Sequence, residues 1–310
     1  MENLKLLENN ILQVEAEELV GHIGEVVRIH GSIYKIRRMS DFAFVLLRTK
    51  RSVVQGVYSG EYSEFPLESL VEESAVIFTA RVVAEERSKV GYELQLLQME
   101  VLSVPAESSP IVINQKKVDT SIENLLSYRP ITLRNEKERA IFKLQEGIGR
   151  AFREFLYNEN FTEIHTPKIV ATGAEGGANI FKLEYFGKEA YLAQSPQFYK
   201  QMMVGVYERV FEIAPVFRAE KHDTSRHLNE YTSVDFEMGY ITGFEEIMDM
   251  EEKMLKLMLS YLQEHYTKEL ELLKVQLPKI EKIPRVRFME AKEMVALAYG
   301  REIKDYEDFE

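Results

Sequence analysis

Short apolar runs alternate with polar turns along the first hundred residues. The runs are rich in Val, Ile, Phe and Leu, and charged or glycine-bearing turns separate them, which predicts five strands at residues 25–31, 42–48, 52–58, 75–84 and 92–104. A helix is expected at residues 64–73, between the third and fourth strands. Five strands with a helix after the third are typical of a small Greek-key barrel of the oligonucleotide-binding (OB) type.

The pattern changes after these strands. Proline and serine gather at residues 105–110, as is typical of a linker. Further along, an apolar residue recurs every three or four positions, which predicts a long helix whose apolar face carries Ile141, Leu144, Ile148, Phe152 and Phe155. The extended segment FTEIHTPKIV follows, in which Pro167 limits the ladder hydrogen bonds to one side. Residues 244–273 are again helical, with one side formed by Ile247, Met254, Met258 and Tyr261.

These patterns predict an α+β chain in three parts. Residues 1–104 are expected to form the barrel domain, residues 105–130 a linker and residues 131–310 a second domain. A chain of 310 residues is long enough for two domains, each with its own core.

The composition narrows the class of protein. Hydrophobic residues make up 45% and charged residues 29%, which is ordinary for a globular chain. The absence of Cys excludes disulfides, thiolate catalysis and cysteine metal sites. No stretch approaches the ~18–20 apolar residues that a membrane span needs, and the acidic N-terminal region does not resemble a signal peptide. We therefore expect a cytoplasmic protein with no membrane partner.

The charge is distributed unevenly. The net charge of −12 argues against sequence-blind binding of nucleic acid. Residues 28–51, however, hold seven Lys or Arg and one acidic residue, Asp41. The net charge of the whole chain therefore does not exclude a local phosphate-binding surface at residues 28–51.

The first of four chemical patterns is a hairpin at residues 217–238. Arg218 and Glu220 are expected to face the same way on its first strand, and Tyr231 follows a polar tip. Arginine binds oxyanions bidentately and keeps its charge, and an aromatic ring can stack on a base. A solvated hairpin with surface ion pairs is the commoner meaning of such a charged run.

Two further patterns lie before this hairpin. Residues 171–181 hold three glycines within five positions, with Glu175 between them as a candidate anchor for an ammonium group; a plain surface loop explains them equally well. Residues 192–201 read LAQSPQFYKQ, where an apolar strand ends and a helix begins. Helix capping accounts for Ser195 and Pro196 but not for Gln197 or Lys200.

The fourth pattern lies in the predicted barrel. Phe42 and Phe44 alternate on one strand, and Gln55 lies on the next. Aromatic residues beside basic ones on a barrel face are typical of a platform for unpaired bases, whereas the alternative is that both rings belong to the core.

In this order, the four patterns resemble the class II aminoacyl-tRNA synthetases of the aspartyl/asparaginyl subgroup, in their compact archaeal-type form. The long helix with FTEIHTPKIV is similar to the family's first motif, whose proline, here Pro167, lies at a dimer interface, and residues 217–238 are similar to the second motif. The segment LAQSPQFYKQ resembles the aspartate form of the amino-acid recognition segment. The resemblance covers about residues 20–260 and implies an OB-fold anticodon-binding barrel followed by an antiparallel-sheet catalytic domain, a homodimer, and the ligation of aspartate to tRNA-Asp.

The resemblance also implies roles for single residues in binding ATP. Arg218 would bind the α-phosphate and the substrate carboxylate and stabilise charge at phosphorus, so it is the expected catalytic residue. Glu220 would hold the adenine side, and Tyr231 would stack on the adenine. The remaining ATP-binding residues implied are Arg226 and His227, at the γ-phosphate, and Leu228.

Other residues would contact the amino acid and the tRNA. Glu175 would bind the α-ammonium group of aspartate, Gln197 would contact the amino acid, and Lys200 would pair with the β-carboxylate. In the barrel, the anticodon would be met by Arg37, Phe44 and Gln55.

The chain departs from the family pattern in two places. The third motif and the ligands of Mg²⁺ are expected beyond residue 310, so the catalytic domain is expected to be incomplete and no metal ligand is expected within residues 1–310. Ser32 stands where the family often carries Trp, which leaves open whether tRNA-Asn is also charged. An asparagine–tRNA ligase, a non-catalytic tRNA-binding paralogue and an amide-forming relative remain as alternatives, and the barrel argues against the last.

Overall fold

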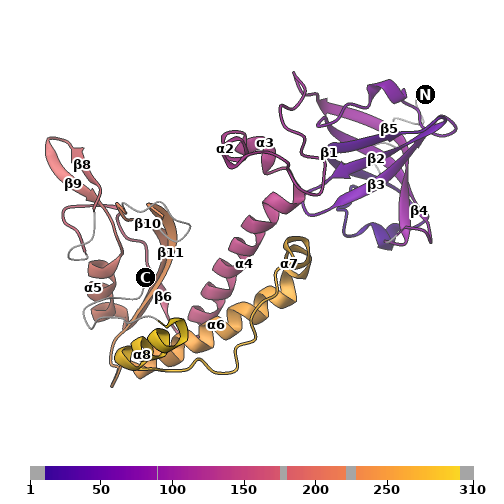
Figure 1. Cartoon of the computed structure of the whole chain (residues 1–310). Coiled ribbons are helices and arrows are strands. Elements are labelled where there is room, and N and C mark those ends of the chain that lie inside the picture. The colour runs from indigo at the N-terminus through magenta and orange to yellow at the C-terminus, as the bar shows by residue number, and fades with distance from the viewer. Residues whose placement is uncertain (1–10, 89, 175–179, 221–227, 301–310) are drawn as a thin grey trace. The chain divides into compact units, whose positions relative to one another are not determined.

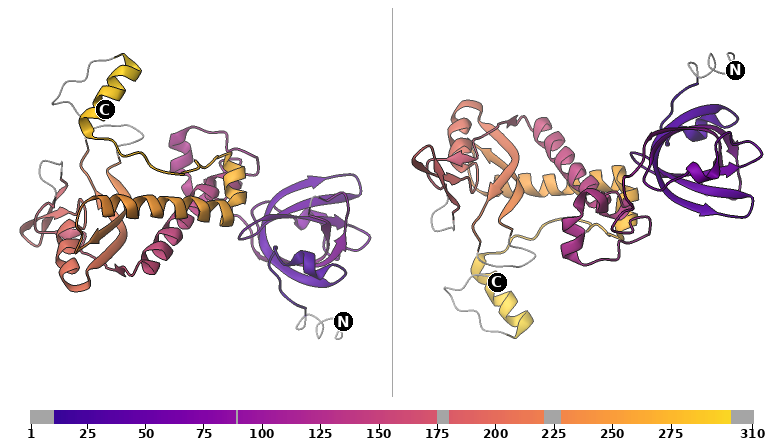
Figure 2. Two further views of the ribbon diagram at one scale, coloured as in Figure 1. Left: turned by 90° about the horizontal axis from the view of Figure 1, so that it is seen from below. Right: turned by 90° about the horizontal axis from the view of Figure 1, so that it is seen from above.

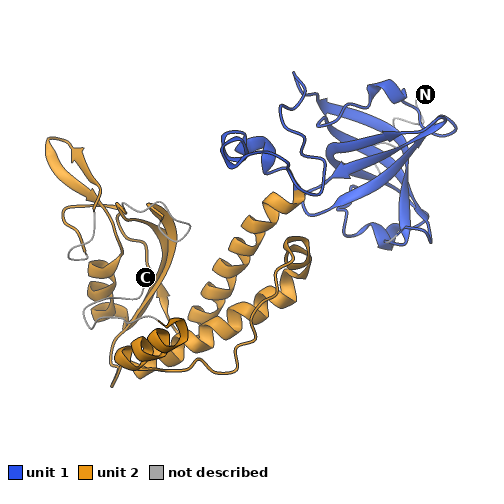
Figure 3. Cartoon of the chain, in the orientation of Figure 1, with its two compact units in different colours: residues 1–135 blue, residues 136–310 orange. Residues whose placement is uncertain are grey.

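The chain divides into two compact units, residues 1–135 and residues 136–310 (Figure 3). The structure, a computed structural model, describes residues 11–88, 90–174, 180–220 and 228–300 (Figure 1).

The first unit is built around a closed five-stranded barrel with the strand order β1-β2-β3-β5-β4. Strands β3 and β5 pair in parallel, and the other neighbours are antiparallel. Figure 2 shows the barrel nearly end-on, as a ring of strands around its core. Alternate side chains point inward, and Val27, Ile29, Val45 and Phe78 are almost completely buried. The predicted barrel is confirmed, with strands at Val26–Arg38, Phe42–Arg48, Val53–Ser59, Ala75–Ala84 and Tyr92–Ser103.

The expected end of the first strand at Gly31 is wrong. Strand β1 continues through this residue, because Gly31 serves a close approach between strands rather than a turn. A Cβ atom built there would lie 2.6 Å from the carbonyl oxygen of Arg48 and 2.8 Å from Leu47. Only glycine lets β1 pass β2 at this distance.

The helix expected at residues 64–73 is also wrong, since this stretch holds only the 3₁₀ turn η2 (Leu67–Ser69). Pro66 has an extended backbone there, with φ −74° and ψ 141°. Phe65, Leu67 and Leu70 pack against the barrel core from outside its strands. These three apolar residues therefore cover the barrel core from a loop and do not form the face of a helix.

Residues 105–135 are attached to the barrel by buried polar contacts. The hydroxyl of Tyr34 donates to the carbonyl of Ile113 over 2.7 Å. The side-chain amide of Asn135 donates to the carbonyls of Ile113 and Gln115 at 2.8 and 2.7 Å. Two short helices, α2 (Ile122–Ser127) and α3 (Arg129–Thr132), complete this part of the first unit.

An ion-pair network strengthens the same attachment. Arg48 is buried and donates to both carboxylate oxygens of Glu73, at 2.7 and 2.9 Å. Arg134 adds a third contact to Glu73, at 2.9 Å. Burial alone raises the pKa of Glu73, but hydrogen bonds from Arg48 and Arg134 and their charges outweigh it and hold the pKa below its ordinary value.

Over its described residues, the second unit contains two three-stranded sheets and five helices. One sheet has the order β11-β10-β6 and the other the order β7-β9-β8. The strands are β6 (Thr162–Glu163), β7 (Ile169–Val170), β8 (Lys182–Tyr185), β9 (Lys188–Leu192), β10 (Arg209–Phe217) and β11 (Glu230–Met238). The helices are α4 (Glu136–Asn158), α5 (Gln197–Tyr207), α6 (Glu245–His265), α7 (Thr267–Leu273) and α8 (Phe288–Tyr299).

The hairpin of β10 and β11 has an apolar face and a polar face. On the apolar face, Phe211 lies opposite Phe236, and both pack with Phe152 and Phe155 of α4. The alternate positions form the polar face, against which α5 packs. Figure 1 shows α5 on one side of the hairpin and α4 with α6 on the other.

The long helices follow the predicted apolar faces only in part. Phe152 and Phe155 of α4 are buried as expected, whereas Ile141 near its start is 50% exposed. Gly147 lies where α4 meets α6 and α7: a Cβ there would be 2.7 Å from Leu262 and Tyr266. Within the described ranges, no helix is both long enough and apolar enough to cross a membrane.

Candidate functional site

Three segments meet at the backbone of Ala193, directly after β9. The Ala193 amide donates to the carbonyl of Lys168 over 2.9 Å. The Ala193 carbonyl accepts from the amide of Phe217, the last residue of β10, also over 2.9 Å. The segment with Pro167, the segment that leads into α5 and the start of the hairpin tip are therefore held side by side.

Lys200 lies on the polar face of the hairpin, in the first turn of α5, and is 5% exposed. Its Nζ lies 3.0 Å from Asp235 Oδ1 and 3.5 Å from Glu237 Oε2 on β11. Ser233 donates to the other oxygen of Asp235. An ammonium group taken out of water needs such partners, so Asp235 and Glu237 compensate the buried charge of Lys200.

A second buried ion pair lies on the same face of the sheet. Glu212 of β10 is 2% exposed, and its carboxylate accepts from the Thr166 amide at 2.6 Å and the Thr166 hydroxyl at 2.9 Å. Lys168 Nζ lies 2.8 Å from the same carboxylate. The sequence analysis did not single out Glu212, although one acidic residue inside the apolar strand RVFEIAPVF was a signal that could have found it.

The lead-in to α5 is tightly packed. Gln194 is 1% exposed, and a Cβ on Gly173 would lie 3.1 Å from its side-chain oxygen. The helix begins one residue later than expected, with Pro196 as its N-cap, but Ser195 still accepts from the Gln197 amide over 3.3 Å. Gln197 and Lys200 thus both lie in the first turn of α5.

The expectation that Arg218 and Glu220 lie on a strand is wrong. Strand β10 ends at Phe217, and the Glu220 amide donates to the Arg218 carbonyl over 2.8 Å, which closes a tight turn. The Arg218 amide donates to the carbonyl of Asn229 over 3.0 Å, across the base of the tip. Arg218 therefore directly follows the segment that is bonded to Ala193.

The other predicted ATP-binding residues lie on or beyond the tip. Tyr231 stands on β11 opposite Val216, on the polar face that also carries Asp235, and Leu228 is 55% exposed. The predicted residues Glu175, Arg226 and His227 lie outside the described residues.

The three predicted anticodon residues come together on the outer surface of the barrel. Arg37 and Phe44 are cross-strand partners on β1 and β2, and Gln55 on β3 lies opposite Leu46. The positions between them, such as Val45, point into the core. The Phe42 ring lies beside Phe44, with centroids 5.2 Å apart and planes at 90°. Both rings therefore lie on the outer face and not in the core.

Part of the basic stretch at residues 28–51 is engaged within the barrel. Arg28 Nη2 lies 2.6 Å from Glu100, and Arg48 is buried against Glu73. The outer face therefore carries less free positive charge than the sequence indicates, and Arg37 is its central exposed cation.

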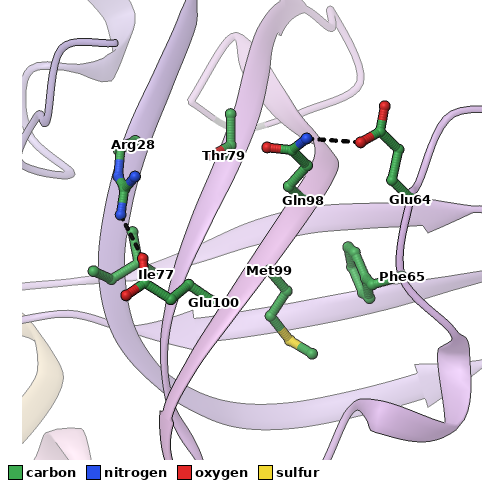
Figure 4. A pocket seen from close by; sticks show the side chains of 8 residues that line it. All are labelled: Arg28, Glu64, Phe65, Ile77, Thr79, Gln98, Met99 and Glu100. Atoms are coloured by element: carbon green, nitrogen blue, oxygen red, sulfur yellow. Dashed lines mark hydrogen bonds and ion pairs between the residues drawn. The ribbon is translucent and has the colours of Figure 1, made fainter. Parts of the chain in front are cut away.

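A pocket of about 280 Å³ lies on a different wall of the barrel, formed by β1, β4, β5 and the loop before η2 (Figure 4). Its carboxylates are already engaged, since Arg28 pairs with Glu100 and Gln98 donates to Glu64 over 2.7 Å. None of the predicted site residues lines it. Among the described residues, no group of three or more His, Asp or Glu side chains could hold a metal ion.

Comparisons with known proteins show the family to which the chain belongs. The family model "tRNA synthetases class II (D, K and N)" matches residues 121–308. The chain is 43% identical over 287 residues to the aspartate–tRNA(Asp/Asn) ligase of Deinococcus radiodurans, a match that covers 92% of this chain and 65% of that ligase. It is 37% identical over 294 residues to the aspartate–tRNA(Asp) ligase of Pyrococcus horikoshii, which covers 93% of this chain and 66% of that one.

Solved structures show the same architecture. The asparaginyl-tRNA synthetase of Pyrococcus horikoshii complexed with asparaginyl-adenylate superposes with a TM-score of 0.88 at 32% identity, over 96% of this chain and 70% of that one. The aspartyl-tRNA synthetase of Entamoeba histolytica gives a TM-score of 0.81 at 28% identity, over 98% and 67%. This chain thus spans about two thirds of the length of its relatives, with 65% of the Deinococcus ligase covered. The chain belongs to the class II tRNA synthetases of the D, K and N group.

Proposed function

We propose that this chain ligates aspartate to tRNA-Asp. The carboxylate of aspartate would attack the α-phosphorus of ATP, which gives aspartyl-adenylate and releases pyrophosphate, and the terminal adenosine of the tRNA would then take the acyl group. The observation that carries the proposal is the buried Lys200, held by Asp235 on the polar face of the hairpin.

Lys200 would select the substrate by its charge. A β-carboxylate entering beside Asp235 and Glu237 would gain an ion pair with the ammonium group in a site that is largely shielded from water. The neutral side chain of asparagine would leave that charge less well compensated, so it would be rejected. Gln197, in the same turn of α5, would contact the amino acid, and Glu175 would bind its α-ammonium group.

The adenylation step would depend on positioned cations rather than on an acid or a base. Arg218 would bind the α-phosphate and the substrate carboxylate, and its place is supported by the bonds around Ala193 and Asn229. Tyr231 would stack on the adenine, and the rest of the nucleotide would be held by Glu220, Arg226, His227 and Leu228. Mg²⁺ would accompany the ATP phosphates and offset their charge. The described residues contain no cluster that could hold Mg²⁺, so we assign it no protein ligand and no step.

The barrel would bind the anticodon. Phe44 would stack on one base and Gln55 would read another, while Arg37 would contact the backbone phosphate. tRNA-Asn is a second candidate substrate, since relatives named aspartate–tRNA(Asp/Asn) ligase are among the proteins that this chain matches. A homodimer that works in the cytoplasm completes the proposal.

The proposal is tested by aspartate-dependent exchange between ATP and labelled pyrophosphate, measured on the 310-residue chain. Exchange with aspartate and not with asparagine or glutamate is the expected result. Exchange with asparagine instead would identify an asparagine–tRNA ligase. A folded chain that binds tRNA but exchanges with no amino acid would contradict ligase activity of the 310-residue chain and mean a truncated form or a non-catalytic tRNA-binding paralogue.

A further inference from the structure

The polar face of the hairpin holds a buried carboxylate that the proposed reaction does not use. Glu212 is 2% exposed, and three donors from a single short segment point at it: the Thr166 amide, the Thr166 hydroxyl and the Lys168 ammonium group, at 2.6, 2.9 and 2.8 Å. Lys168 also donates to the Thr166 hydroxyl over 2.9 Å. This set of bonds fixes residues 166–168 against β10.

The fixed segment is bonded in turn to the residues that lead into Lys200. The Lys168 carbonyl accepts from the Ala193 amide, and β7 pairs with β9 immediately before Ala193, through Ile169 and Leu192. Seven residues after Ala193 the chain reaches Lys200. We call the bonds from Thr166 and Lys168 to Glu212 the anchor. The position of α5 over the sheet therefore depends on this anchor.

Charge gives this anchor a second effect. Glu212 and Asp235 are direct cross-strand partners and so lie on one face of the sheet, with Cβ atoms about 5 Å apart by the geometry of such pairs. Two carboxylates this close repel each other in a buried setting. Here each has a lysine of its own, Lys168 for Glu212 and Lys200 for Asp235.

We propose that the Glu212–Lys168 pair is a positioning element for the aspartate site. It holds the segment that carries Lys200, and it prevents the charge of Glu212 from drawing Lys200 away from Asp235. This inference rests on the proposed function for its effect on aspartate, whereas its effect on the backbone at Ala193 stands without it.

The electrostatic argument predicts a distinctive pattern among variants. In Lys168→Met, Glu212 keeps its charge and loses its counter-ion, so it competes with Asp235 for Lys200. In the double variant Lys168→Met/Glu212→Gln, that charge is gone, and the amide can still accept from Thr166. The double variant should therefore perform better than Lys168→Met alone.

The experiment compares these variants by their KM for aspartate and for ATP in pyrophosphate exchange. Lys168→Met is expected to raise the KM for aspartate by about tenfold or more and to change the KM for ATP by less than about twofold. The double variant should recover most of that loss, and Lys168→Arg should stay close to the parent. The matched control is the exposed pair Lys182–Glu189, with 3.4 Å between its charged atoms, where Lys182→Met should change neither constant.

Hydrogen exchange at the amides of Ala193 and Phe217 provides a readout independent of catalysis. Both amides should exchange faster in Lys168→Met and return toward the parent rate in the double variant. Equal rises in the KM for aspartate and for ATP, or a double variant no better than Lys168→Met, would contradict the proposal that Lys168 keeps Glu212 from competing for Lys200. Unchanged amide exchange would contradict the proposal that the Glu212–Lys168 pair fixes the backbone at Ala193. If the parent chain lacks pyrophosphate exchange, the proposed function fails. The amide measurement then still tests whether the Glu212–Lys168 pair fixes the backbone at Ala193. If Lys168→Met does not fold, Glu212→Gln and Lys168→Arg carry the comparison.

Discussion

At the scale of single residues, buried charges mark the site more clearly than exposed ones. Phe211 and Phe236 lie on one face of a two-stranded hairpin, in the hydrophobic core. Glu212 and Asp235 lie on the other face, where Lys200 of α5 pairs with Asp235. Ions in such surroundings are costly unless they are paired, so their presence indicates a purpose other than stability.

Replacement of Lys200 tests that purpose. In Lys200→Met the aliphatic length is kept and the charge is lost, so aspartate-dependent pyrophosphate exchange should fall by about a hundredfold or more, because the β-carboxylate loses its counter-ion. The thermal midpoint should also fall, because Asp235 loses its buried counter-ion, so exchange is measured at a temperature where the variant is folded. Unchanged exchange would remove Lys200 from the site. Lys182→Met, on an exposed part of β8, serves as the control.

A glycine in the barrel gives a prediction about stability. In Gly31→Ala the new methyl group would meet the Arg48 carbonyl at 2.6 Å, so the free energy of unfolding should fall by about 1–3 kcal/mol. Denaturant unfolding of the whole chain measures it. Gly60→Ala is the matched control, because a Cβ there has nothing within 4 Å among the described residues. Equal effects of the two substitutions would contradict the close approach of β1 and β2.

At the scale of elements, the sequence predicted strands best where one face of the strand is buried and the other is exposed to solvent. Residues 42–48 and 75–84 match β2 and β4, because over most of each strand the inward positions are buried and the outward positions are more exposed. The pattern misled where apolar residues cover a core without forming an element, as Phe65, Leu67 and Leu70 do. It also failed at the tip of the hairpin, where β10 ends at Phe217 and the Glu220 amide closes a turn on the Arg218 carbonyl.

The candidate site was predictable in its residue types but not in its pairings. Lys200 stood out because helix capping does not explain it, and Phe44 because an aromatic residue beside basic ones on a barrel face is typical of a platform for unpaired bases, with Gln55 on the next strand. The partners Asp235 and Glu212 could not be assigned, since they depend on the register of β10 with β11 and on the path of residues 166–168.

The outer barrel face has its own prediction. Phe44→Ala removes a stacking surface, so the free energy of tRNA-Asp binding should weaken by about 1–3 kcal/mol at fixed salt concentration. The barrel should stay folded, since Phe44 is not part of its core cluster. Phe186→Ala, at a residue that is 89% exposed in the other unit, is the control. A filter-binding titration that detects no difference between the two variants would argue against an anticodon face on β1–β3.

The free energy of unfolding at acidic pH should depend on the ion pairs of Glu73 with Arg48 and Arg134. Because Arg48 and Arg134 hold the pKa of Glu73 below its ordinary value of 4.5, the ionised group stabilises the folded state above that pH. This contribution is lost as the pH falls through the lowered pKa. Unfolding by urea between pH 3 and pH 7 should therefore show Glu73→Gln less stable than the parent near neutrality, with the gap closing in acid. A gap of constant size would mean that the pKa of Glu73 does not differ between the folded and unfolded states, which contradicts the lowered pKa.

At the scale of the whole molecule, the division after residue 135 has a practical consequence. Residues 105–135 belong with the barrel because Tyr34 and Asn135 hold residues 113–115. A fragment of residues 1–135 should fold cooperatively. A fragment of residues 1–110 leaves the buried Tyr34 hydroxyl without its acceptor, so it should be less stable by about 2 kcal/mol or more. Circular dichroism during urea unfolding compares the midpoints of the two fragments. Equal midpoints would show that the attachment of residues 111–135 does not stabilise the barrel.

The meeting point at Ala193 joins three segments through peptide groups alone, its amide to Lys168 and its carbonyl to Phe217. These bonds use only N–H and C=O groups, which every residue supplies except proline at the two donor positions, 193 and 217. Sequence drift can therefore exchange the groups that face a substrate while the main chain that presents them is inherited unchanged. The close superposition with an asparaginyl-tRNA synthetase at 32% identity agrees with this. The side chains around this junction can therefore change without a new fold.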